Sequence, residues 1–136
     1  MKHGLLILLG ILFLSSCDLI IVEEPFDPRL NFVGRYEAEE YSETFDEYLY
    51  YDVRVTLDDG YYSDIIYLEN FYNLNADVQA EVYGNSITIP RQRIGNWLIQ
   101  GTGHLEYGDL VLTYSVEDLN RPRLPVDFCN TIMYLR

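Results

Sequence analysis

Lysine, histidine and cysteine are nearly missing from this chain of 136 residues, and each shortage narrows what the chain can do. Lys2 is its one lysine, and 22 acidic residues outnumber nine basic ones to leave a formal net charge of −13. A surface this acidic repels phosphate backbones and anionic lipid head groups. We therefore expect no nucleic acid partner and no membrane contact through a basic patch.

The scarcity of histidine and cysteine leaves little material for catalysis. Beyond the N-terminal segment there is one histidine, His104, which falls on the polar face of an expected strand. Cys129 could form a nucleophile pair with it, but neither residue lies in a motif typical of such a pair. Zinc takes three or four ligands at characteristic spacings, and no such spacing occurs. We expect no enzyme, no metal site and no cofactor.

Acidic residues do gather at two expected turns, where calcium is the ion to consider. Calcium takes six to eight oxygen ligands, and neither cluster has the spacing of an EF-hand loop. A solvated acidic rim, which keeps an exported protein soluble, is the favoured interpretation over a calcium site. The clusters comprise Glu37, Glu39, Glu40, Glu43, Asp46 and Glu47 at the first turn, and Asp58, Asp59 and Asp64 at the second.

The first sixteen residues have the features of an export signal. Lys2 precedes an apolar run, Leu5 to Leu14, which is too short to span a membrane but suits a signal peptide. The following Leu14-Ser15-Ser16-Cys17 resembles the lipobox of bacterial lipoproteins, in which the cysteine thiol is joined to diacylglycerol and the peptide is cut just before it. The resemblance implies a membrane anchor at Cys17, while the alternative is an ordinary signal peptide with a chance cysteine.

Three regions follow from this interpretation. Residues 1–16 would be the signal peptide, and residues 17–31 the lipidated cysteine with an extended, proline-containing tether. Residues 32–136 would form one domain, long enough to build a core without disulfides. Cys129 is expected to be a buried apolar residue of the last strand, with Val126, Phe128, Ile132 and Tyr134 also in the core; a reactive thiol is the alternative.

From Val33 onward the pattern predicts short strands separated by turns, and no helical period. Pro90 should end a strand or mark a break in it. About eight strands indicate an antiparallel β-barrel, with a β-sandwich as the alternative. Two expected strands show the alternation best. In the first, one face carries Leu49, Tyr51, Val53, Val55 and Leu57, and the opposite, outer face carries Tyr48 and Tyr50. In the second, one face carries Trp97, Ile99, Gly101, Gly103, Leu105 and Tyr107.

Several segments together resemble a family of small, uncharacterised lipoproteins of Bacteroidota with a lipocalin-like barrel. The resemblance covers nearly all of residues 27–136, and it implies an exported, non-catalytic protein anchored to the outer membrane, on either its periplasmic or its surface side. In lipocalins an arginine near the end of the last strand packs over an aromatic ring of the first, which would place Arg136 over Tyr36. The segments are Asp27-Pro28-Arg29, Phe32-Val33-Gly34-Arg35-Tyr36, Asn70-Phe71, Gly84 to Pro90 and Gly101-Thr102-Gly103.

Two functions remain open at this point. An eight-stranded barrel is just wide enough to hold one small ligand or to be filled by its own side chains. In the first case Gly101 and Gly103, beside Trp97 and Ile99, would leave room for a small apolar ligand. In the second case a filled barrel would meet an unidentified protein partner through an acidic, tyrosine-rich exterior.

Overall fold

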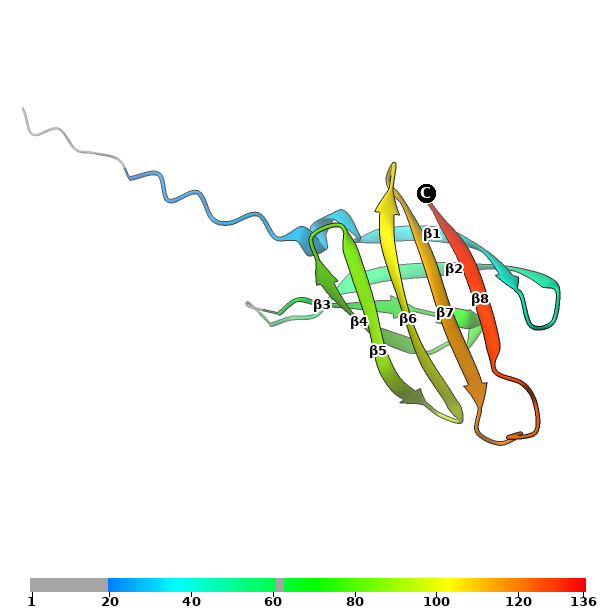
Figure 1. The fold of residues 1–136 in the computed structure, drawn as a ribbon. Coiled ribbons are helices and arrows are strands. Elements are labelled where there is room, and N and C mark those ends of the chain that lie inside the picture. The colour runs from blue at the N-terminus through cyan, green and yellow to red at the C-terminus, as the bar shows by residue number, and fades with distance from the viewer. Residues whose placement is uncertain (1–19, 61–62) are drawn as a thin grey trace, which may run out of the picture.

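The computed structural model describes residues 20–60 and 63–136; the expected signal peptide and Cys17 lie outside the described residues. Eight antiparallel strands are each paired with the next, and β8 pairs with β1, so the sheet closes into a barrel (Figure 1). The predicted all-β barrel is confirmed, and the β-sandwich alternative is wrong. Among the described residues no helix has the length and hydropathy needed to cross a membrane.

Two short 3-10 helices accompany the strands. η1 precedes β1 and η2 lies between β3 and β4, and together with the closed eight-stranded sheet they are consistent with the lipocalin-like architecture that the sequence resembles. The elements are η1 (Pro28–Asn31), β1 (Gly34–Ser42), β2 (Glu47–Leu57), β3 (Ile65–Glu69), η2 (Phe71–Asn73), β4 (Asp77–Tyr83), β5 (Ser86–Ile94), β6 (Trp97–Glu106), β7 (Asp109–Asp118) and β8 (Asp127–Leu135).

Alternation along the strands explains the core. Successive side chains of a strand point to opposite faces, so every second residue enters the barrel. In β2 this places Tyr51, Val53 and Val55 inside and leaves Tyr48 and Tyr50 exposed, as predicted. β5 continues through Pro90, because the register shifts between Ile89 and Gln92 and the missing proline N–H falls at this irregularity.

The same alternation corrects the prediction for β8. Cys129 is buried inside the barrel, as expected. Its neighbours Phe128, Ile132 and Tyr134 therefore lie at positions of opposite parity and are exposed on the outer face, not in the core. Tyr107, predicted to share the inward face of β6, lies beyond the end of β6 in the tight β6–β7 turn and is fully exposed.

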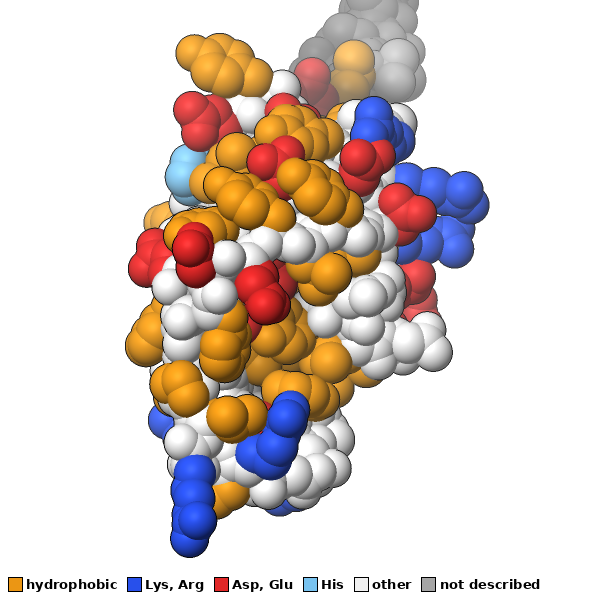
Figure 2. Space-filling view, turned by 90° about the vertical axis from the view of Figure 1, so that its right-hand side faces the viewer, with side chains coloured by type: hydrophobic (Ala, Val, Ile, Leu, Met, Phe, Trp, Pro, Cys, Tyr) orange, Lys and Arg blue, Asp and Glu red, His pale blue; other side chains and the backbone are white. Residues whose placement is uncertain are grey.

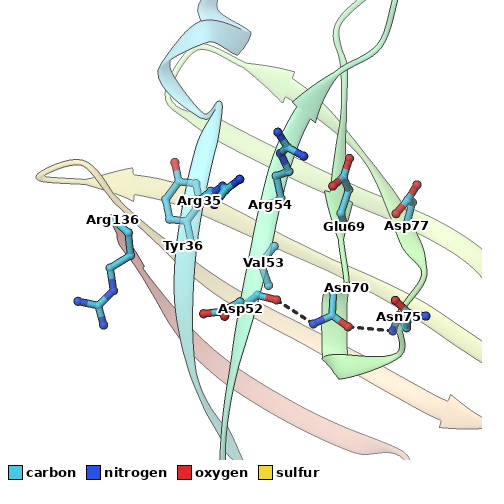
Figure 3. Close-up of a pocket in the computed structure, with 10 residues that line it drawn as sticks. All are labelled: Arg35, Tyr36, Asp52, Val53, Arg54, Glu69, Asn70, Asn75, Asp77 and Arg136. Carbon is cyan, nitrogen blue, oxygen red and sulfur yellow. Dashed lines mark hydrogen bonds between the residues drawn. The ribbon is translucent and has the colours of Figure 1, made fainter.

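One end of the barrel is closed by η1, which packs there although residues 17–31 were expected to form an extended tether. The buried Arg29 guanidinium pairs with Asp27 at 2.8 Å and donates to the carbonyls of Asp58 and Ile65 in the β2–β3 connection. Arg29, not Arg136, is thus the arginine buried at this end. Arg136 instead pairs with Glu37 on the outside, and Figure 3 shows its side chain extending away from the Tyr36 ring.

The opposite end is covered by η2 and its flanks. Phe71 is fully buried, and its ring centroid lies 4.5 Å from that of Tyr114. Tyr72 adopts a left-handed backbone conformation with φ of 55°, which is unusual for a bulky side chain. The energetic cost of this conformation must be offset by contacts of the residue, and Tyr72 forms hydrogen bonds with Asp127 and Tyr51.

Candidate functional site

The barrel interior changes character along its axis. Towards η1 it is aliphatic, built from side chains such as Val55, Ile66 and Leu112. Towards η2 it becomes polar. The buried and partly buried polar side chains there form hydrogen bonds around two carboxylates, and we call this set the polar network. Its members are Glu40, Ser42, Tyr51, Tyr72, Tyr114, Asp127 and Thr131.

Glu40 is the deeper carboxylate and is only 2% exposed. It accepts a hydrogen bond from the Tyr51 hydroxyl at 2.5 Å and another from the Tyr114 hydroxyl. Burial raises the pKa of Glu40, an effect that the two hydroxyl donors oppose and the nearby Asp127 reinforces. Burial likewise raises the pKa of Tyr51 and Tyr114, so both phenols remain protonated donors.

Asp127 is the second carboxylate and lies where β8 begins. One of its oxygens accepts from the Ser42 hydroxyl at 2.5 Å and the other from the Tyr72 hydroxyl at 2.6 Å. The Tyr72 contact holds the strained η2 in place over the barrel. Within residues 20–60 and 63–136, no arginine or histidine forms an ion pair with either Asp127 or Glu40.

The two residues considered as a nucleophile pair are not brought together. Cys129 points into the barrel, where burial and the neighbouring carboxylates raise the pKa of its thiol, so the reactive thiolate is disfavoured. His104 lies on the outer face of β6, more than half exposed, with its Nε2 atom 3.6 Å from Glu106. The wall of the barrel separates the two side chains.

The four residues predicted to surround a ligand line different environments. Trp97 is half-buried at the η2 end, and Ile99 is fully buried in the core. Gly101 and Gly103 do not open a space, because a Cβ on Gly101 would lie 2.4 Å from the Cβ of Tyr114, and one on Gly103 2.2 Å from Cδ2 of Leu112. The neighbouring side chains of β7 occupy the room that the missing glycine side chains leave.

The acidic clusters do not converge as a metal site would require. Within the part of the chain that the structure describes, no group of three or more His, Cys, Asp or Glu side chains is arranged to hold a metal ion. In the first cluster Glu40 points into the barrel, whereas Glu37 and Glu39 lie at outward positions of the same strand. The calcium interpretation therefore has no geometric support among these residues.

The outer wall over β2, β1 and β8 carries aromatic and apolar side chains interleaved with carboxylates, and we call it the acidic tyrosine face (Figure 2). In the sheet register Glu39 lies between Tyr50 and Ile132, and Glu37 lies beside Tyr134. Tyr41 and Tyr48 pack against each other with ring centroids 4.9 Å apart. The face comprises Glu37, Glu39, Tyr41, Tyr48, Tyr50, Phe128, Ile132 and Tyr134.

A second outer feature is a hollow of about 610 Å³ over β1 to β4, crossed by a row of charges (Figure 3). Arg35 lies opposite Arg54, Arg54 opposite Glu69, and Glu69 opposite Asp77. No ion pair joins these four side chains. The row presents both charge signs side by side and selects neither an anion nor a cation, so we assign no ligand to it.

Comparison of the sequence with protein-family models finds no matching family, and comparison with curated proteins finds no match.

Proposed function

We propose that this protein is an exported, lipid-anchored and non-catalytic barrel that binds another protein of the cell envelope through its acidic tyrosine face. One observation carries the proposal: large apolar side chains stand exposed among carboxylates on β1, β2 and β8. Tyr48 and Tyr50 are 62% and 61% exposed, although their rings could contribute to a core. Contiguous exposed apolar surface rimmed by polar groups is typical of protein interaction sites, and tyrosine is enriched there.

The charge of this face specifies the chemistry of the partner. Glu37 and Glu39 lie among the tyrosines, and Arg136 contacts the edge of the face through Glu37. A partner that is apolar at its centre and carries lysine or arginine at its rim would complement this surface. Such complementarity accelerates association and makes it sensitive to salt.

Cys17 supplies the second half of the proposal. A diacylglycerol on this residue would hold the barrel at the outer membrane through residues 18–27, and residues 20–27 form no helix or strand and lead away from the barrel (Figure 1). A single acyl chain gives only marginal membrane binding, whereas the two chains of a diacylglycerol would supply a stable anchor. The anchor restricts the partner to proteins within reach of the same membrane.

An apolar ligand in the lumen, the other function suggested by the sequence, is less compatible with the interior. Tyr114 and Leu112 occupy the space next to Gly101 and Gly103. A ligand there would have to displace core side chains. We therefore favour a barrel that is filled by its own side chains and binds a partner through its outer surface.

Site-specific photocrosslinking in the native host tests the proposal. A photoreactive phenylalanine analogue at Tyr50 should yield one discrete adduct, whereas the same analogue at Thr102, an outward and exposed position on β6, should not. Glu39→Arg should abolish the Tyr50 adduct. The purified partner should then bind the wild-type protein with an affinity that falls as salt rises, and bind the variant more weakly.

The proposal would be abandoned if Tyr50 and Thr102 gave the same adducts, or if Glu39→Arg left the Tyr50 adduct and the measured affinity unchanged. Either result would mean that the acidic tyrosine face does not select a partner.

A further inference from the structure

Beyond protein binding, we propose that the η2 end of the barrel binds a small organic cation, an ammonium or methylated ammonium group on a short apolar body. The site is a cavity of about 80 Å³, here called the mouth cavity, where the β1–β2 turn, η2, β6 and the β7–β8 connection meet. Its size suits a head group and excludes a long acyl chain. The lining residues on which the site depends are Phe45, Tyr72, Trp97, Asp118, Arg121 and Asp127.

The carboxylate of Asp127 supplies the negative pole of this site. It is 5% exposed, it lines the cavity, and both of its protein donors are neutral hydroxyls, those of Ser42 and Tyr72. A buried carboxylate is unfavourable unless a positive charge or strong hydrogen bonds compensate for lost hydration. A ligand cation would provide the charge that the described part of the protein does not.

The one basic side chain of the lining is already engaged. Arg121 pairs with Asp118 through its Nε atom at 2.7 Å, on the rim of the cavity. This pair neutralises Asp118 and leaves Asp127 as the carboxylate whose charge is available to a ligand. The net charge of the chain, −13, further favours cations over anions at any opening.

Aromatic rings form the walls beside this carboxylate. The ring centroids of Tyr72 and Trp97 lie 5.9 Å apart, with the ring planes inclined at 67°, so the two rings enclose a corner. Phe45 approaches from the β1–β2 turn. A cation within about 6 Å of a ring centroid is attracted by the π electrons, and an indole ring attracts it most strongly. Rings and a buried carboxylate together favour an ammonium over a neutral group of equal size.

Trp97 is the single tryptophan of the chain, so its fluorescence reports on the mouth cavity directly. The full-length protein, held in an uncharged maltoside detergent, is titrated with tetramethylammonium chloride at constant ionic strength. We expect a saturable change in Trp97 emission at millimolar concentrations. The uncharged, similarly sized tert-butanol should cause no saturable change.

Two variants locate the site. Asp127→Asn should weaken binding about tenfold or more, which corresponds to about 1.4 kcal/mol. Glu106→Gln removes an equal charge at the opposite end of the barrel and should leave the affinity unchanged. Because Asp127→Asn disturbs contacts of Ser42 and Tyr72 and could unfold the barrel, Phe45→Ala provides a second variant. Phe45 lies in an exposed turn, and loss of its ring should weaken binding without loss of circular dichroism signal.

A response equal for tetramethylammonium and tert-butanol, equal affinities for Asp127→Asn and Glu106→Gln in folded protein, or no saturable response at all would each overturn the proposal. Competition by phosphatidylcholine vesicles would identify the quaternary ammonium of a lipid head group as the source. Saturation by the free cation that such vesicles leave unchanged would identify a free small amine. Both of these outcomes support the site, and neither depends on the protein partner proposed above.

Discussion

Gly101 and Gly103 lie in β6 at positions where β7 leaves no room for a side chain. A Cβ on Gly101 would lie 2.6 Å from the carbonyl oxygen of Thr113, a backbone atom that cannot rotate away. Gly101→Ala should therefore lower the free energy of unfolding by about 1–3 kcal/mol through overpacking. Urea denaturation monitored by Trp97 fluorescence measures the effect as a lower midpoint at unchanged slope.

Thr102, the outward residue between the two glycines, provides the matched control. Thr102→Val keeps a β-branched side chain on the exposed side of the same strand, so it should change stability by no more than about 0.5 kcal/mol. If Gly101→Ala were as stable as the wild type, the interior beside Gly101 would have room for an added methyl group. That result would support a ligand in the lumen.

Glu40 makes stability depend on pH in a direction opposite to that of most acids. Its pKa is raised in the folded state, so the native protein holds the proton more tightly than the unfolded chain does. The contribution of protonated Glu40 is complete below its ordinary pKa of 4.5 and is lost as the pH rises towards the raised folded pKa.

Replacing Glu40 by an uncharged residue isolates its contribution to the pH dependence of stability. Glu40→Gln keeps an oxygen that can accept from Tyr51 and Tyr114 but carries no charge, so its stability relative to the wild type should increase from pH 4.5 upwards. Thermal melts between pH 4 and pH 8 measure the difference. Glu39→Gln removes a charge from an outward position of the same strand and should not reproduce the trend. A constant difference between Glu40→Gln and wild type across this range would contradict the argument.

The polar network illustrates what residue patterns reveal and what they conceal. Tyr36, Ala38, Glu40 and Ser42 share one parity in β1, so the alternation alone could have placed Glu40 inside. The surrounding acids hid this signal, because a run rich in carboxylates is normally solvated. Tyr72 carried no comparable signal, since its left-handed conformation depends on Asp127, which is 55 residues away in the sequence.

At the scale of elements, Arg29 is the residue of η1 that is buried at the η1 end of the barrel. Arg29→Met would remove the guanidinium hydrogen bonds to Asp27 and to the carbonyl oxygens of Asp58 and Ile65, and would keep the backbone hydrogen bond from residue 29 to Asp27. Loss of hydrogen bonds to buried groups should lower stability by about 1–3 kcal/mol. Thermal unfolding followed by circular dichroism measures the loss, and Arg35→Met on the outer face serves as the control. Equal melting temperatures for the two variants would show that η1 docks without Arg29.

Element boundaries were harder to predict than element types. β3 is confined to Ile65–Glu69, because Asn70 turns into the left-handed region and directs the chain into η2. Asn73 and Asn75 adopt the same conformation, which asparagine tolerates better than most residues. The asparagine-rich stretch therefore indicates a turn. The burial of Phe71 inside the barrel could not be predicted locally, because it depends on contact with Tyr114 of β7.

At the scale of the whole molecule, strand count and parity favoured an antiparallel barrel and left a β-sandwich as the alternative, which the pairing of β1 with β8 excludes. They could not decide whether the barrel is hollow, because that depends on how side-chain volumes from different strands combine. Tyr114 and Leu112 fill the positions opposite Gly101 and Gly103, and this pairing follows from the β6–β7 register and not from either segment alone.

Membrane attachment is the prediction that belongs to this scale. Cys17→Ala should move the protein from the membrane to the soluble fraction and leave the signal peptide uncut by the lipoprotein peptidase. Fractionation with immunoblotting measures both effects, and Cys129→Ala is the control because that thiol is buried in the barrel. Membrane retention of Cys17→Ala equal to that of the wild type would remove the lipid anchor from the proposed function.

The pairing of β1 with β8 also determines when this molecule can fold. Tyr36 lies opposite Leu135, so the first strand finds its second neighbour only after the whole domain has been synthesised. The other seven pairings join strands that are adjacent in the sequence, whereas this one closes a loop of almost the whole domain, and the entropy of closing that loop is lost before the β1–β8 contacts form. Until β8 is available, β1 exposes an unpaired edge, so the barrel closes only once the last strand is free.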